Sequence, residues 1–230
     1  MRRAAVHRYS ATGTGPGHIT DDGCPVDLYA LLPATGEADV VHSAIPAGAT
    51  ILELGAGAGR ITRGLLAHGH RVVAVDHSAR MLAHIPGTPT MCAPIESLAI
   101  DERFAAVLLA SYLVNETDDT LRAAWLATCV RHLAPGGALI LQRHTPSWFD
   151  RAEPYERVER GITFRLRRVS RPAPHLLEAT MEYEHDGRRW THSYVHRRMD
   201  DDDIAAALAG AGLRLDSFLT EDRAWILARR

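Results

Sequence analysis

The stretch 51-ILELGAGAGR-60 passes directly from an apolar run to three alternating glycines, Gly55, Gly57 and Gly59. Glycine is entropically costly in ordered structure unless the chain needs a left-handed turn or a ligand approaches the backbone closely. The apolar run predicts a short buried strand, and the glycines predict a turn at its end. Glu53 places a carboxylate just before this turn. The stretch therefore predicts a strand that ends at a ligand-binding loop.

Strands and helices alternate outward from this loop. Further predicted strands are short apolar runs at 71–78, 88–94, 104–111, 138–144, 213–220 and 224–230. Predicted helices lie at 26–43, 59–69, 79–85, 118–137 and 200–212. Alternation of this kind predicts βαβ units, and continuous apolar runs fit parallel strands that are buried on both faces. We expect an α/β fold with a Rossmann-like, doubly wound, mostly parallel seven-stranded sheet.

The pattern changes after residue 148. Segments 161–170, 175–184 and 188–199 alternate apolar and polar residues, as half-exposed strands do. The Asp186-Gly187 pair between the last two is a strong hairpin signal. These strands predict a small antiparallel sheet inserted at 149–199. The predicted core then comprises 45–148 and 200–230, preceded by an N-terminal loop and helix at 1–44.

Composition excludes several classes of function. The 230 residues, 46% of them hydrophobic, suit one domain with an insertion, and the net charge of -2 gives no electrostatic footprint for nucleic acid. The three cysteines are scattered and odd in number, so neither a disulfide framework nor a thiolate metal site is expected. No apolar run reaches the roughly 18 residues of a membrane span, and the basic N-terminus lacks an apolar signal core. We expect a cytoplasmic protein with no membrane partner.

The glycine loop does not fit the common phosphate-binding motifs. A dinucleotide fingerprint requires a third glycine where Arg60 stands, and all 26 basic residues are arginines, so no P-loop lysine exists. The expected ligand therefore need not carry phosphates. Instead, the spacing of Glu53, Gly55, Gly57 and Gly59 resembles the first motif of class I S-adenosylmethionine (SAM)-dependent methyltransferases. The resemblance extends over about half of the chain, through Asp76 at the end of 71-RVVAVDHS-78 to 132-HLAPGGALIL-141.

This resemblance implies a role for each matching position. Gly55, Ala56 and Gly57 would let the backbone approach SAM, and Glu53 would organise the loop, mainly through its backbone amides. Asp76 would accept hydrogen bonds from both ribose hydroxyls. The remaining cofactor contacts implied are His77 and Met81 beside the adenine, Ser111 near the methionyl group, and Tyr29 on an N-terminal helix that caps the site.

The chain departs from the family at the end of the third strand. Many relatives carry Asp there, whereas this chain has Ala93. Recognition of the adenine would then fall to the backbone at Pro94 and Ile95 or to the side chain of Glu96. Structural alternatives stay open: the glycines can serve the turn alone, Met81 can belong to the core, and Glu96 can be a solvated acid at a helix start.

Methyl transfer from a sulfonium is an in-line displacement, so the enzyme mainly positions the acceptor atom. His144, at the end of its strand, is the candidate general base, with a structural hydrogen-bonding role as the alternative. Tyr112 is a second candidate catalytic residue. Asn115 and Trp148 are expected to contact the acceptor from the same edge of the sheet.

The inserted sheet is expected to act as a lid over the substrate. Trp190, His192 and Tyr194 alternate along one strand and predict either an aromatic acceptor site or a face packed against the core or a dimer partner. His196 on the same face would lie about 13 Å from His192, so no metal site is expected. Arg165 and its arginine neighbours predict either an acidic substrate or a solvated edge.

The expected function is transfer of a methyl group from SAM to nitrogen or oxygen of a small-molecule acceptor, with S-adenosylhomocysteine as the product. A natural-product intermediate is one candidate acceptor, and a homodimer is possible. Two alternatives stay open: a SAM-fold enzyme that catalyses another reaction, such as cyclisation, and a non-catalytic SAM-binding module.

Overall fold

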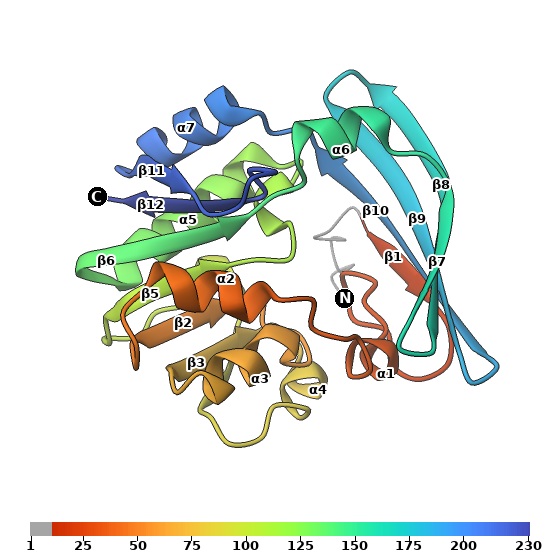
Figure 1. Cartoon of the computed structure of the whole chain (residues 1–230), viewed down its shortest axis with the longest axis horizontal. Helices are drawn as coiled ribbons and strands as arrows, with labels where there is room; N and C mark the ends of the chain where they lie inside the picture. Colours follow the sequence, from red (N-terminus) through yellow and green to blue (C-terminus); the bar gives the residue numbers. More distant parts are fainter. Residues whose placement is uncertain (1–10) are drawn as a thin grey trace, which may run out of the picture. The chain divides into compact units, whose positions relative to one another are not determined.

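A computed structural model describes residues 11–230 of the chain. The chain forms two compact units (Figure 1). The larger unit combines Ala34–Arg151 with Arg197–Arg230. The smaller unit combines the chain before Ala34 with Ala152–His196. This division places residues 34–44 with the larger unit, whereas the sequence suggested a separate N-terminal segment up to residue 44.

The larger unit is built on a seven-stranded sheet. Its strands, in spatial order, are β11 (Arg214–Phe218), β12 (Trp225–Arg229), β6 (Leu133–Gln142), β5 (Phe104–Leu109), β2 (Thr50–Leu54), β3 (Arg71–Asp76) and β4 (Thr90–Cys92). The five strands from β6 to β4 pair in parallel. β12 and β11 complete the sheet with antiparallel pairing. The predicted Rossmann-like, mostly parallel sheet is confirmed.

Helices cover both faces of this sheet (Figure 1). The helices of the larger unit are α2 (Glu37–Ala44), α3 (Arg60–Ala67), α4 (Ala79–Leu82), α5 (Asp119–His132), α6 (Pro146–Arg151) and α7 (Asp201–Gly210). α2 and α3 pack on one face in a core that includes Val41, Leu65, Ile51 and Leu108. α5 and α7 lie on the opposite face. Because both faces are covered, the strands read as continuous apolar runs.

The smaller unit contains a five-stranded sheet. Its spatial order is β1 (Thr12–Thr14), β10 (Arg188–Arg197), β9 (Leu176–His185), β8 (Ile162–Ala173) and β7 (Tyr155–Glu159). Asp186 and Gly187 both have positive φ, at 47° and 72°, as the predicted tight hairpin between β9 and β10 requires. The second antiparallel sheet is therefore confirmed, with two more strands than the sequence predicted.

The predicted helix at 26–43 is wrong. The structure has a short helix α1 (Val26–Tyr29) in the smaller unit and α2 in the larger one. Pro33 and Gly36 lie between them, and Gly36 has a φ of 92°. Proline removes a helical hydrogen bond and left-handed glycine ends a helix, so the apolar periodicity could not continue across this segment.

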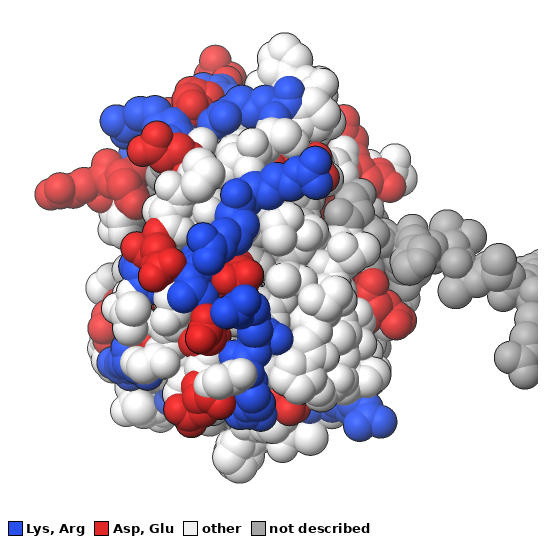
Figure 2. All heavy atoms as spheres, turned by 90° about the vertical axis from the view of Figure 1, so that its right-hand side faces the viewer, with Lys and Arg blue, Asp and Glu red and all other residues white. Residues whose placement is uncertain are grey.

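Charged side chains of both signs form a band across one face of the five-stranded sheet (Figure 2). Arg165 on β8 lies 2.6 Å from Glu156, 3.2 Å from Glu182 and 2.7 Å from Glu184. Hydrogen bonds to Glu184 and then Glu156 raise the pKa of Arg165 above its ordinary value. Because this guanidinium is already neutralised by carboxylates, the structure favours the solvated-edge alternative over an acidic-substrate site.

Candidate functional site

The glycine loop joins the end of β2 to the start of α3. Gly55, Gly57 and Gly59 have φ values of 69°, 55° and 80°, which side-chain-bearing residues rarely adopt. A Cβ on Gly55 would lie 2.7 Å from Leu113 Cδ1, and one on Gly59 would lie 2.7 Å from Ile85 Cγ1. Both the turn and its packing therefore require glycine here. The same geometry leaves the loop without side chains at these three positions.

Asp76 ties this loop to the neighbouring strand end. The Gly57 amide donates a hydrogen bond to Asp76 Oδ2 at 2.8 Å, and the Ser78 amide donates to Oδ1 at 2.8 Å. The backbone amide of Ala56 also bonds to Val75 O at 2.9 Å. Each of the two carboxylate oxygens of Asp76 therefore accepts from a backbone amide, one in the glycine loop and one after β3. Asp76 is thus both the anchor of the loop and an acceptor at its edge.

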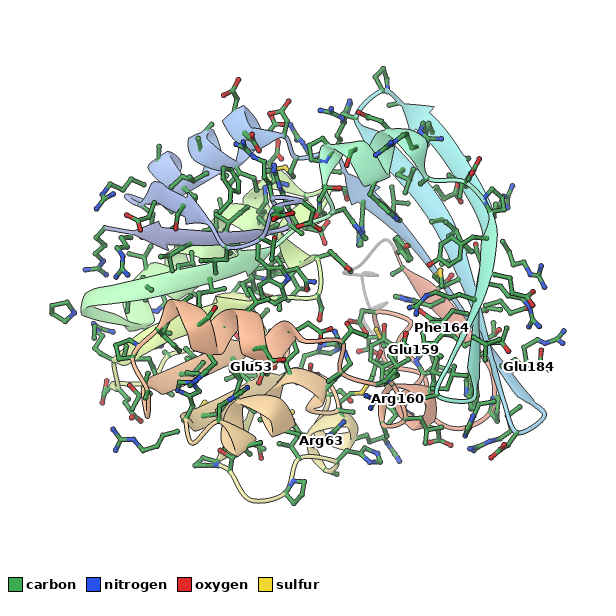
Figure 3. The ribbon with its side chains drawn as sticks, viewed as in Figure 1. Glu53, Arg63, Glu159, Arg160, Phe164 and Glu184 are labelled. Atoms are coloured by element: carbon green, nitrogen blue, oxygen red, sulfur yellow. The ribbon has the colours of Figure 1, made fainter. Side chains whose placement is uncertain are left out.

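Glu53 of β2, which is labelled in Figure 3, is buried in the larger unit. Its side chain is 3% exposed, and the Thr62 hydroxyl on α3 donates to Glu53 Oε2 at 2.6 Å. The expected bonds from the loop amides to Glu53 are not found among residues 11–230, because Asp76 takes the Gly57 amide instead. Burial raises the pKa of Glu53 from 4.5 to about 7, and the nearby Asp76 charge adds to that rise. The Thr62 hydrogen bond and Arg63 act in the opposite direction.

The residues predicted to hold the adenine follow β3 and β4. The Ala93 amide bonds to the Asp76 carbonyl at 3.0 Å, so the end of β4 lies beside the end of β3. Ile95 and Glu96 follow in a short 3-10 turn after Pro94. Glu96 Oε2 accepts a hydrogen bond of 3.1 Å from Trp125 Nε1 on α5, so Glu96 is held by α5 rather than simply solvated.

Two further adenine candidates lie at the start of α4. His77 Nδ1 is 3.6 Å from Asp76 Oδ1, which places this imidazole at the same strand end. Met81 is only 2% exposed, and its amide donates to the Ser78 hydroxyl at the N-terminus of α4. The structure therefore favours the core alternative for Met81.

Ser111 and Tyr112 form a strained turn after β5. Both have positive φ, at 54° and 64°, which is uncommon for residues other than glycine and clusters at functional sites. The Ser111 amide donates to Gln142 Oε1 at 2.8 Å, so the end of β6 supports this turn. The strained turn keeps Ser111 exposed at the carboxyl edge of the sheet.

His144 is stacked between aromatic rings at the end of β6. Its ring centroid lies 3.7 Å from that of Tyr112 and 3.9 Å from that of Trp148, with interplanar angles of 9° and 12°. The His144 amide donates to Asn115 Oδ1 at 2.9 Å, and Asn115 Nδ2 donates to Arg197 O at 2.8 Å. Asn115 is 0% exposed, so its predicted contact with the acceptor is not supported. Its buried amide fixes the backbone at His144 instead.

The other predicted residues lie in the smaller unit. Trp190 is 0% exposed and donates from Nε1 to Pro16 O at 2.9 Å, so its predicted acceptor contact is not supported either. His192 and Tyr194 remain partly exposed, with ring centroids 5.6 Å apart, and burial lowers the pKa of His192. Tyr29 meets the His192 ring edge-on at 6.5 Å, and burial raises the pKa of Tyr29.

Residues 51–137 match the family model described as a methyltransferase domain. This part of the chain is similar to a methyltransferase domain. It contains the glycine loop, Asp76 and the strained turn, and the resemblance drawn from the sequence is confirmed. No match was found among curated proteins.

Solved methyltransferase structures share the fold over most of the chain. A SAM-dependent methyltransferase from Clostridium acetobutylicum has a TM-score of 0.71 and 15% identity, over 88% of this chain and 94% of that one. The sugar N-methyltransferase KedS8 from Streptoalloteichus has a TM-score of 0.70 and 21% identity, over 85% and 87%. The SAM-bound amino pentose methyltransferase CalS10 from Micromonospora echinaspora has a TM-score of 0.66 and 22% identity, over 83% and 87%.

Three residues of the larger unit support the site but were not predicted. Thr62 holds Glu53, Trp125 holds Glu96, and Gln142 holds the strained turn that carries Ser111. Of these three, only Thr62 could have been found from the nearby sequence. Its hydroxyl lies on the first turn of α3, directly after the loop, where it can bond to the Glu53 carboxylate on β2. Trp125 lies 29 residues from its partner and Gln142 lies 31 residues from Ser111, so only the fold brings them to the candidate site.

No helix in the described part of the chain combines the length and apolar character needed to span a membrane. Within the same residues, no group of His, Cys, Asp or Glu side chains is arranged to hold a metal ion.

Proposed function

We propose that the protein transfers a methyl group from SAM to a nitrogen or oxygen atom of a small-molecule acceptor. The observation that carries this proposal is the Asp76 carboxylate at the end of β3, which accepts from the Gly57 amide and so lies against the glycine loop. Ribose hydroxyls are donors that such a carboxylate recognises in nucleotide-binding folds. The match of residues 51–137 to a methyltransferase domain supports the same reading.

The described residues fit SAM by their chemistry. The backbone at Gly55, Ala56 and Gly57 would receive the methionine and ribose portions, because no side chain beyond the Ala56 methyl stands there. Asp76 would hold the ribose hydroxyls. The remaining proposed contacts are His77, Pro94, Ile95 and Glu96 for the adenine, exposed Ser111 for the methionyl group, and Tyr29 from the smaller unit.

Bound SAM supplies an electrophilic methyl group on a sulfonium. The protein's task is then to orient the acceptor atom in line with that methyl group and to remove a proton from the acceptor when it must lose one. His144 is the proposed base because its ring lies at the carboxyl end of β6, beside the strained turn that carries Ser111. His192 and Tyr194 of the smaller unit are proposed to contact the acceptor.

An amino group on a sugar-like molecule is the preferred acceptor in this proposal. Two solved structures with the same fold are those of a sugar N-methyltransferase and an amino pentose methyltransferase. A glycopeptide N-methyltransferase with a TM-score of 0.59 is 25% identical to this chain. These relatives suggest which acceptors to test first.

The test is a panel of amino sugars, hydroxylated sugars and simple amines incubated with SAM and the purified protein. We expect equimolar formation of methylated acceptor and S-adenosylhomocysteine. In the His144→Gln variant we expect turnover to fall by roughly a hundredfold, within the range for loss of a general base, with SAM binding preserved. Product without S-adenosylhomocysteine would instead indicate another reaction on the same site. Tight SAM binding without turnover on any acceptor would indicate a binding module.

A further inference from the structure

The imidazole of His144 is enclosed by a three-ring stack. Tyr112 and Trp148 each lie less than 4 Å from it, centroid to centroid, and nearly parallel to it. Two aromatic rings cannot both occupy one face of an imidazole at these separations without overlapping each other. They must therefore cover its two opposite faces, which leaves only the edge of the ring for hydrogen bonding.

Two side chains hold the backbone on both sides of this stack. Gln142 Oε1 accepts from the Ser111 amide, next to Tyr112, and Asn115 Oδ1 accepts from the His144 amide. The two bonds run in opposite directions between the turn after β5 and the end of β6. Each segment therefore supplies a side chain that fixes the backbone of the other. This reciprocal bonding explains how two consecutive residues persist at positive φ.

The third ring is held by α6. The Trp148 amide donates to Thr145 Oγ1 at 3.1 Å, and the next residue, Phe149, is 1% exposed and anchors the helix. The Trp148 side chain is only partly buried, so packing in the core does not account for its position. Its ring lies on the imidazole instead.

We propose that Tyr112 and Trp148 are positioning residues that clamp His144 in one ring plane, so that its nitrogens can act only along the edge of the stack. This inference rests on the proposed role of His144 as base. It revises the expectation that Tyr112 acts in catalysis directly and that Trp148 contacts the acceptor. The clamp removes rotation of the imidazole about its side-chain bond, and aromatic faces on both sides stabilise the imidazolium that forms when the base takes a proton.

The experiment compares Trp148→Leu with Trp148→Phe, which keeps a flat ring against His144. In protein with labelled histidine, we expect the carbon-bound ring protons of His144 to resonate upfield, because they lie between two aromatic rings. In Trp148→Leu these signals move downfield, whereas in Trp148→Phe they stay close to their original position. Exposed His84 serves as the internal control, since its signals stay unchanged in both variants.

Turnover provides the second readout. We expect Trp148→Leu to lower kcat about ten- to a hundredfold with little change in the KM for SAM, and Trp148→Phe to restore most of the rate. Tyr112→Leu should reproduce both effects from the opposite face, and it replaces Trp148→Leu if that variant does not fold. Thermal unfolding of each variant shows whether it is folded.

The possible outcomes separate the clamp from the role of the base. If the His144 signals do not move in either leucine variant, the clamp is wrong, whatever His144→Gln does to turnover. If the signals move but kcat stays unchanged in every variant, including His144→Gln, then His144 is clamped but is not the base. A rate lost equally in Trp148→Leu and Trp148→Phe would also overturn the proposal, because a flat ring should suffice.

Discussion

The carboxylate of Asp76 is the residue whose replacement tests the cofactor site most directly. Asp76→Ala removes the acceptor of the Gly57 and Ser78 amides as well as the proposed ribose contact. Hydrogen bonds to a charged group contribute about 1.5–3 kcal/mol each, so we expect SAM affinity to fall at least tenfold in calorimetric titration.

A matched control for Asp76→Ala is Asp101→Ala, an exposed carboxylate before β5. The control should bind SAM and S-adenosylhomocysteine as the unaltered protein does. Unchanged affinity in Asp76→Ala would contradict the assignment of the ribose site. If affinity is lost, a circular dichroism spectrum that matches that of the control excludes unfolding as the cause.

The raised pKa of Glu53, next to the glycine loop, predicts that the stability of the protein depends on pH. Its folded-state pKa is about 7, above the ordinary 4.5 of the unfolded chain. Between these values the folded state binds more protons than the unfolded state, so this group's contribution to the free energy of unfolding falls as pH rises through the window. From about pH 5 to about pH 8, that loss is on the order of 1–3 kcal/mol.

The isosteric Glu53→Gln variant isolates this effect, since its amide oxygen can still accept from Thr62. Denaturant unfolding at pH 5 and pH 8 should show the variant gaining stability relative to the unaltered protein as pH rises, since only the unaltered protein loses the contribution of Glu53. The histidines titrate equally in both proteins, so their effect cancels in the difference. A constant difference between the two proteins across this range would show that Glu53 stays ionised in the folded state.

At the scale of elements, the parallel core was predictable and the smaller sheet only in part. Strands such as 104–109 are uninterrupted apolar runs, so burial on both faces is visible in the sequence. β7 is missed because all its residues but Glu159 are exposed and most are charged, so no apolar alternation marks it. β1 has only three residues and becomes a strand through its pairing with β10. Such long-range pairing leaves no local pattern.

The acidic first turn of α7 suits the helix dipole, and the structure adds a specific cap. The Asp200 carboxylate accepts from the Asp203 amide, and the Asp203 carboxylate accepts from the Asp200 amide, each at 3.0 Å. We expect Asp200→Ala to lower the free energy of unfolding by about 1 kcal/mol. Asp202→Ala removes an exposed charge from the same turn without removing the cap, and should cost much less. Equal losses in urea unfolding would mean that dipole charge, not the cap, stabilises α7.

For the molecule as a whole, the residues predicted for the site come from two separate units. The glycine loop, Asp76 and His144 belong to the larger unit, whereas Tyr29, His192 and Tyr194 belong to the smaller one. The sequence motif could identify the first group because a strand end and a glycine loop are local. The motif could not identify Tyr29, His192 and Tyr194, because these residues lie in chain segments outside it.

Hydrogen exchange with and without SAM tests that division. Ligand binding suppresses local opening, so we expect slower exchange in peptides covering 51–60, 76–81 and 93–98, whose backbone lines the proposed cofactor site. Slower exchange at 26–32 would support the capping role of Tyr29, and unchanged exchange there would remove Tyr29 from the cofactor site. The Asp76→Ala protein, tested at the same SAM concentration, should show weaker protection in all of these peptides. Protection that omits 51–60 in the unaltered protein would contradict the proposed function, because the bare backbone of the glycine loop would then have no ligand.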